Sequence, residues 1–170
     1  MTAHWIDITA DGFSGYLSLP PTGRGPGIVL LQEIWGVNEH IRALADQYAL
    51  DGYVVLAPDL FWRLERRVDL AYDEAGSARA RQLLQTVDGT QAAADVAAAV
   101  DVLRARPEVT GRVATLGYCF GGQMAFRAAA LARADAAVCY YGGGIAGHLD
   151  LAPRVTMPVL FHHAGQDSLI

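Results

Sequence analysis

A cysteine flanked by glycines is the part of this sequence best suited to nucleophilic chemistry. The segment Gly-Tyr-Cys-Phe-Gly-Gly at 117–122 fits the pattern glycine–x–nucleophile–x–glycine, with Cys119 where serine is commoner. An apolar segment typical of a strand (112–117) precedes it, and a segment typical of a helix, from Gly121 to Ala132, follows it. A sharp turn between them would strain the nucleophile's backbone and exclude larger neighbours. The pattern predicts a nucleophile elbow that sets the Cys119 sulfur above a sheet, at a helix N-terminus that favours thiolate.

The cysteines also allow a purely structural interpretation. A glycine-rich turn can hold an inert, buried cysteine, and this alternative stays open for Cys119. Cys139 lies in Ala-Ala-Val-Cys-Tyr-Tyr, a pattern typical of a buried strand, so we expect it in the core. The two form neither a C-x-x-C pair nor a metal-binding spacing.

The start of the chain lacks the features of a secretion signal and no apolar run is long enough to span a bilayer, so we expect a soluble, cytoplasmic protein with free thiols.

A second group of residues, Gln-Glu-Ile-Trp-Gly-Val-Asn at 32–38, follows an apolar segment of strand length. In proteins with a nucleophile elbow, the loop at this place donates one backbone N–H to an oxyanion hole, and the residue after the nucleophile donates the other. The donors here would be Ile34 and Phe120. Glu33, at the carboxyl end of the strand, would lie close to the Cys119 thiol and could act on its proton. A solvated loop carboxylate is the alternative interpretation of Glu33.

Strands and helices that would position these residues alternate along the chain. The segments 4–9 and 13–19 predict a hairpin around the turn residues Asp11 and Gly12. Further strands are expected at 27–33, 53–57, 112–117, 136–141 and 158–163, helices at 38–50, 73–87, 90–106 and 121–132, and a charge-rich excursion at 58–67. This alternation predicts an α/β fold with a doubly wound, mostly parallel sheet. No repeat or linker divides the chain, so we expect one domain over 1–170.

Composition and charge exclude several classes of function. The formal net charge is −5 and no basic stripe exists, which argues against nucleic-acid binding. The sequence contains no lysine, so no lysine can act as a nucleophile. The segment 142–147 fits G-x-G-x-x-G, but Pro153 ends the next segment too early for a dinucleotide-binding helix. His162 and His163 lack a set of carboxylate or cysteine partners, so we expect neither a metal nor a cofactor.

Five segments together resemble the dienelactone hydrolase family of the α/β-hydrolase superfamily. They are Gln-Glu-Ile-Trp-Gly-Val-Asn (32–38), Gly-Tyr-Val-Val-Leu-Ala-Pro-Asp-Leu (52–60), Gly-Tyr-Cys-Phe-Gly-Gly (117–122), Tyr-Tyr-Gly (140–142) and His-His-Ala-Gly-Gln-Asp (162–167). Their order and intervals are similar to the family's and cover nearly the whole chain. The resemblance implies the α/β-hydrolase fold, no cofactor, and hydrolysis of a small ester or lactone of the carboxymethylenebutenolidase type through a thioacyl intermediate.

The resemblance also implies a Cys–His–Asp triad with Cys119 as nucleophile. Asp167 would be the acid that orients the histidine, and Glu33 would pair with the resting thiol and help to generate thiolate. Asp167 follows a late strand, as the acid of such a triad does, although an ordinary turn aspartate is the alternative. No histidine follows Asp167 in this sequence. We therefore expect the triad histidine beyond Ile170, and a chain that lacks the C-terminal strand and helices of the fold.

The resemblance further implies that arginines hold a carboxylate on the substrate, since a guanidinium meets a carboxylate through two parallel hydrogen bonds. Arg79 and Arg81 are the candidates for this role. Two other functions stay open: a non-catalytic binding module on the same scaffold, suggested by the missing histidine, and a broader carboxylesterase or thioesterase. We expect a small-molecule substrate, no nucleic-acid or membrane partner, and a monomer or small homo-oligomer.

Overall fold

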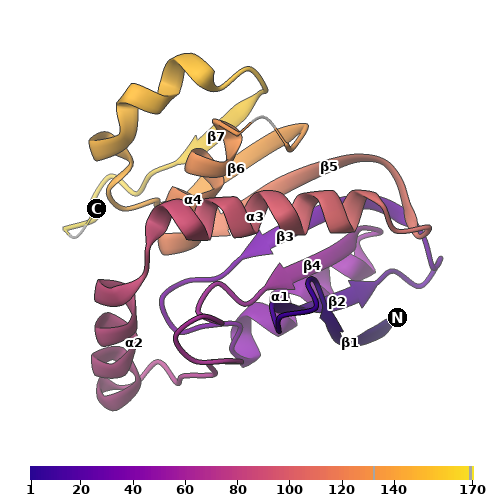
Figure 1. Cartoon of the computed structure of the whole chain (residues 1–170), viewed down its shortest axis with the longest axis horizontal. Helices are drawn as coiled ribbons and strands as arrows, with labels where there is room; N and C mark the ends of the chain where they lie inside the picture. The colour runs from indigo at the N-terminus through magenta and orange to yellow at the C-terminus, as the bar shows by residue number, and fades with distance from the viewer. Residues whose placement is uncertain (132, 169) are drawn as a thin grey trace.

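One sheet with helices on both faces forms the framework of the protein (Figure 1). The computed structural model describes residues 1–131, 133–168 and 170. Within them the sheet has seven strands in the order β1-β2-β4-β3-β5-β6-β7. The strands are β1 (Thr2–Asp7), β2 (Ser14–Leu19), β3 (Gly25–Leu31), β4 (Val54–Pro58), β5 (Val109–Tyr118), β6 (Ala136–Tyr140) and β7 (Val159–His162).

The sheet is antiparallel at its N-terminal edge and parallel elsewhere. Strand β1 pairs antiparallel with β2, and β2 pairs antiparallel with β4. From β4 onward, β3, β5, β6 and β7 all pair parallel with their neighbours. The carboxyl ends of these five strands therefore meet at one edge, which is where ligands bind in open α/β sheets.

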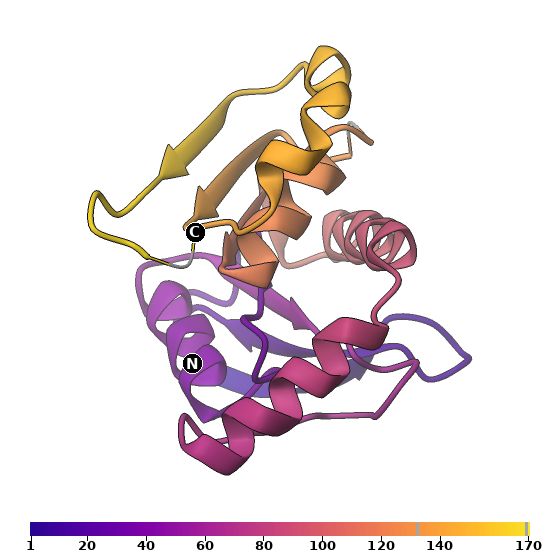
Figure 2. The ribbon, with the colours of Figure 1, turned by 90° about the vertical axis from the view of Figure 1, so that its left-hand side faces the viewer.

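Helices on the two faces bury two separate sets of apolar side chains. The helices are α1 (Glu39–Leu50), α2 (Glu74–Thr86), α3 (Gly89–Arg104) and α4 (Phe120–Ala129). Helix α1 covers one face, whereas α3 and α4 pack on the other (Figure 2). Successive residues of β3 point to opposite faces, so Val29 and Leu31 join the α3–α4 side while Ile28 and Leu30 join the α1 side. This continuous apolar pattern is the reason that β3 can occupy the middle of the sheet.

The doubly wound, mostly parallel sheet predicted from the sequence is confirmed, with shifts at the ends of elements. Strand β3 ends at Leu31, so Gln32 and Glu33 begin a loop rather than finish the strand. A 3-10 helix, η1 (Ile145–Arg154), forms where no element is expected. Helix α4 ends at Ala129, and the predicted end at Ala132 lies outside the described residues. Nowhere in the described chain is a helix both long and apolar enough to cross a membrane.

Candidate active site

The turn from β5 into α4 holds Cys119 in a strained backbone conformation. Its φ of 55° and ψ of −115° lie in a region that side-chain-bearing residues rarely adopt. Close packing explains the flanking glycines: a Cβ on Gly117 would lie 2.1 Å from the carbonyl oxygen of Gly121, and one on Gly121 would lie 2.3 Å from that of Leu31. The Cys119 N–H donates to the carbonyl of Tyr140 on the neighbouring strand at 3.0 Å. The residues at 117–122 thus form the sharp strand-to-helix turn that the sequence pattern predicts.

The Cys119 thiol is half-buried, and its surroundings favour the protonated form. Burial raises the pKa of this thiol, and the negative charges of Glu33 and Asp167 raise it further. A hydrogen bond from the Phe120 N–H acts in the opposite direction. The helix N-terminus would favour thiolate, but desolvation and two nearby carboxylates favour the protonated thiol. In the resting protein these effects are larger than that of the helix N-terminus. Cys139 lies fully in the core, as expected, and burial raises its pKa to about 12.

Two tyrosine hydroxyls converge on the carboxylate of Glu33. The hydroxyl of Tyr72 donates to Oε2 at 2.5 Å, and that of Tyr141 donates to Oε1 at 3.2 Å. Burial and the adjacent Glu33 raise the pKa of both tyrosines, so both hydroxyls keep their protons. Each carboxylate oxygen of Glu33 has its own donor, and the negative charge of Glu33 raises the pKa of the Cys119 thiol. This arrangement differs from that of a freely solvated loop carboxylate.

The loop that carries Glu33 is fixed by the segment that follows β4. Gly36 forms a bridge with Asp69, and a Cβ on Gly36 would lie only 2.1 Å from the carbonyl oxygen of Val68. The Leu70 N–H donates to the carbonyl of Trp35 at 3.1 Å. The ring of Trp35 packs against that of Tyr72, with centroids 4.6 Å apart. These contacts bring Tyr72 to Glu33. The motif at 140–142 points to the region of Tyr141, whereas the sequence holds no comparable signal for Tyr72.

A cavity of about 430 Å³ opens beside Cys119. Its walls are the side chains of Ile34, Leu84, Phe120, Gln123 and Ile170 and the glycines Gly143 and Gly144. Ile34 and Phe120 therefore line the same space as the sulfur. They are the two residues expected to donate backbone N–H groups to an oxyanion.

Asp167, on the loop after β7, is half-buried and accepts a hydrogen bond from the Ile170 N–H at 3.1 Å.

The structure does not bring the two candidate arginines to this cavity. Arg79, on α2, forms an exposed ion pair with Glu65 at 2.7 Å, and Arg81 is exposed on the same helix. Neither is among the residues that line the cavity.

The ring of His162 stacks on Tyr140 at 4.4 Å between centroids. The described residues contain no group of three or more His, Cys, Asp or Glu that could hold a metal ion.

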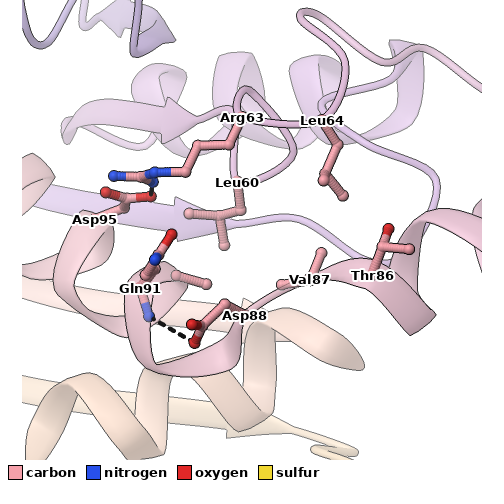
Figure 3. Close-up of a pocket in the computed structure, with 9 residues that line it drawn as sticks. Leu60, Arg63, Leu64, Thr86, Val87, Asp88, Gln91 and Asp95 are labelled. Carbon is pink, nitrogen blue, oxygen red and sulfur yellow. Dashed lines mark hydrogen bonds and ion pairs between the residues drawn. The ribbon is translucent and has the colours of Figure 1, made fainter.

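A smaller cavity of about 90 Å³ lies apart from Cys119, between the loop after β4 and the start of α3 (Figure 3). On its wall, the buried carboxylate of Asp95 forms an ion pair with Arg63 and accepts a hydrogen bond from the Trp62 indole N–H at 3.0 Å. The Arg63 guanidinium in turn lies 4.2 Å from the centre of the Trp62 ring. These contacts attach the loop to α3 and include none of the residues of the elbow.

Comparison with known proteins agrees with this geometry. The family profile of the dienelactone hydrolases matches residues 13–170. The chain belongs to the dienelactone hydrolase family. Among its relatives, carboxymethylenebutenolidase 1 of Cupriavidus pinatubonensis is 33% identical over 174 residues, which cover 100% of this chain and 74% of the relative. The carboxymethylenebutenolidase of Pseudomonas putida is 36% identical over 93% of this chain and 67% of its own length.

Solved structures of the family share the same architecture. A Klebsiella pneumoniae protein assigned as a dienelactone hydrolase superimposes with a TM-score of 0.82 at 27% identity, over 99% of this chain and 75% of its own. The dienelactone hydrolase-like promiscuous phosphotriesterase P91, from metagenomic libraries, gives a TM-score of 0.76 at 30% identity, over 99% of this chain and 71% of its own. The α/β-hydrolase fold expected from the sequence is thereby confirmed.

Proposed function

We propose that this protein hydrolyses a small ester or lactone, with Cys119 as the nucleophile. The class of activity follows from the dienelactone hydrolase family to which the chain belongs. The observation that most supports the nucleophile is the backbone of Cys119, held at a φ of 55° between glycines that no larger residue could replace. A strained residue at the carboxyl edge of a parallel sheet is typical of a reactive side chain rather than of one that only fills space.

The proposed first step is transfer of the Cys119 proton to the adjacent carboxylate of Glu33. A neutral thiol is a weak nucleophile, and the pKa of this thiol is raised in the resting protein, mainly by burial. When the Glu33 carboxylate takes the proton, its negative charge no longer opposes the thiolate. The thiolate then attacks the carbonyl carbon, and the C–O bond to the alcohol breaks. The alcohol leaves with a proton, and a thioester remains on Cys119.

Stabilisation of the negative charge on the attacked oxygen is proposed to come from two backbone N–H groups. The N–H of Phe120 already interacts with the Cys119 sulfur, so it lies close to the reacting centre. Ile34 lines the same cavity. Backbone donors of this kind are held in place before the reaction starts, so they need little reorganisation when charge develops.

Water is proposed to cleave the thioester in the second half of the reaction, releasing the acid and restoring the thiol. A base must remove a proton from this water, and the family resemblance implies a histidine oriented by Asp167. The negative charge of Asp167 raises the pKa of the Cys119 thiol, which supports a place for Asp167 in this site.

Burst kinetics with p-nitrophenyl acetate test the proposal. We expect one equivalent of p-nitrophenol to be released rapidly as Cys119 is acylated, and no burst or turnover from Cys119→Ala. The matched control is Cys139→Ala, which removes the buried thiol twenty positions along the chain and should keep the burst. Equal burst amplitudes in Cys119→Ala and the wild type would refute the assignment of the nucleophile.

A further inference from the structure

Gln32 is a fully buried polar residue at the start of the loop that carries Glu33. Its side-chain Oε1 accepts a hydrogen bond from the backbone N–H of Leu60 at 3.0 Å, and its Nε2 donates to the backbone carbonyl of Glu33 at 3.4 Å. Leu60 belongs to the turn that follows β4. Because water cannot reach the Gln32 side chain, a hydrogen bond lost there is not replaced. The carboxamide of Gln32 therefore joins two loops that are distant in sequence.

The hydrogen bond from Gln32 to Glu33 fixes the orientation of one peptide group. The carbonyl of Glu33 and the N–H of Ile34 belong to the same planar, trans peptide group, so they point in opposite directions. When Nε2 of Gln32 holds the carbonyl, the peptide group cannot turn, and the direction of the Ile34 N–H is set. This N–H is one of the two donors proposed to stabilise the oxyanion, and Ile34 lines the cavity beside Cys119.

The turn that holds Gln32 is itself held in place, and it also touches the second proposed donor. The buried carboxylate of Asp59 accepts hydrogen bonds from the backbone N–H groups of Phe61 at 3.1 Å and Arg67 at 2.6 Å. The ring of Phe61 stacks on that of Phe120, with centroids 5.9 Å apart and an angle of 12° between the ring planes. The turn after β4 therefore contacts Phe120 directly, and it contacts the loop of the other donor through Gln32.

We infer that Gln32 is a positioning residue of the oxyanion hole, which holds the Glu33–Ile34 peptide group in the orientation that the attacked oxygen requires. This inference rests on the proposed function and adds one residue to it. Gln32 does not line the cavity beside Cys119, so it acts through the backbone. Its effect should be confined to steps in which an oxygen atom gains negative charge. Acylation by an ester is such a step, whereas alkylation by iodoacetamide displaces iodide from carbon and creates no oxyanion.

The test compares these two reactions of Cys119 in Gln32→Met, which keeps the length of the side chain and removes both hydrogen bonds. We expect the rate constant of the p-nitrophenol burst to fall at least about 10-fold, because a misdirected donor stabilises the oxyanion poorly. The rate of alkylation should stay within about 2-fold of the wild type, because it depends on the thiolate. Any change in thiolate formation alters both rates, so their ratio isolates the oxyanion hole. Equal changes in the two rates, or no change in either, would overturn the inference.

The control separates the loss of this hydrogen-bonded carboxamide from the loss of any buried hydrogen bond. Ser18→Ala removes the hydroxyl of another fully buried residue, which donates to Oδ1 of Asp46 on α1 at 2.7 Å. Its ratio of acylation to alkylation should equal that of the wild type, and a ratio that falls equally in both variants would overturn the inference. If Gln32→Met does not fold, Gln32→Asn replaces it. The shorter carboxamide cannot reach both partners, so the ratio should again fall, and an unchanged ratio would overturn the inference.

A second measurement does not depend on turnover. Hydrogen–deuterium exchange of the peptide that covers residues 32–38, followed by mass spectrometry, should be faster in Gln32→Met than in the wild type or Ser18→Ala. If the wild type shows no burst but this exchange is found, the proposed function fails, whereas the positioning of the loop by Gln32 stands. If the wild type shows a burst and the exchange in Gln32→Met is unchanged, the hydrolase activity stands and the inference is overturned.

Discussion

In the proposed mechanism Cys119 and Glu33 form the chemical centre of the site, and the negative charge of Glu33 raises the pKa of the Cys119 thiol. A half-buried thiol next to a carboxylate holds its proton more tightly than a thiol in water. In the proposed mechanism the same carboxylate accepts that proton when a substrate arrives. The resting protein would thus keep its nucleophile in the thiol form, which reacts more slowly with oxidants than thiolate does.

The pH dependence of Cys119 alkylation follows from these charges. Because burial, Glu33 and Asp167 raise the thiol pKa, the rate with iodoacetamide should rise with a midpoint above that of an ordinary thiol. In Glu33→Gln one negative charge is removed, thiolate forms at lower pH, and the midpoint should fall. The matched control Glu108→Gln changes a carboxylate just before β5, at the opposite end of that strand from Cys119, and should leave the midpoint in place. A midpoint that rises in Glu33→Gln would contradict this account.

Tyr72 should influence Cys119 through the position of Glu33. Its hydroxyl holds Oε2 of Glu33 at 2.5 Å, so Tyr72→Phe removes one of the two tyrosine hydrogen bonds that orient the carboxylate, while Tyr141 still donates to Oε1. We expect the alkylation midpoint of Cys119 to move part of the way toward that of Glu33→Gln. Tyr53→Phe, which alters an exposed tyrosine just before β4, is the control. If Tyr72→Phe leaves the midpoint unchanged, the hydroxyl does not position Glu33.

At the scale of secondary-structure elements, the junction of β5 with α4 depends on how closely the helix approaches β3. A Cβ on Gly121 would lie 2.3 Å from the carbonyl oxygen of Leu31, the last residue of β3. Helix α4 and β3 can therefore approach each other only where the helix has no side chain. The same approach sets Cys119 next to the loop at 32–38, which begins at the end of β3.

Replacing this glycine should loosen the junction. Gly121→Ala should lower the free energy of unfolding by roughly 1–3 kcal/mol, because the added methyl group forces the helix away from β3. Gly147→Ala is the control, since no atom lies within 4 Å of the position its added methyl group would take, and it should stay within about 0.5 kcal/mol of the wild type. Urea denaturation of both variants gives the comparison. A stable Gly121→Ala chain with an unchanged alkylation rate at Cys119 would count against the close approach.

Across the whole molecule, the arrangement of parallel strands explains which parts of the site could be predicted from the sequence. Glu33, Cys119 and Asp167 each follow a strand whose carboxyl end lies at the same edge, so strand–helix alternation is enough to predict their association. Asp167 and Glu33 do act on Cys119 electrostatically. The doubly wound sheet follows from the same alternation.

Features set by contacts distant in sequence could not be predicted in this way. Tyr72 lies in a stretch without periodic hydrophobicity, and contacts with residues distant in sequence, among them its packing on Trp35, bring it to Glu33. The arrangement of Arg79 likewise depends on Glu65, a partner fourteen residues away in an irregular loop. The raised pKa of Cys119 results from burial and from charges on two other loops, whereas the sequence shows only the adjacent helix N-terminus.

The central claim is that the sulfur of Cys119 carries the acyl group during the reaction. The most direct measurement is mass spectrometry of the chain quenched in acid shortly after mixing with p-nitrophenyl acetate, followed by peptide mapping. We expect a mass increase of one acetyl group on the peptide that contains Cys119, and none on the peptide that contains Cys139. Hydrolysis of the ester with no acetyl group on Cys119 at any time, or with the acetyl group on another residue, would contradict it.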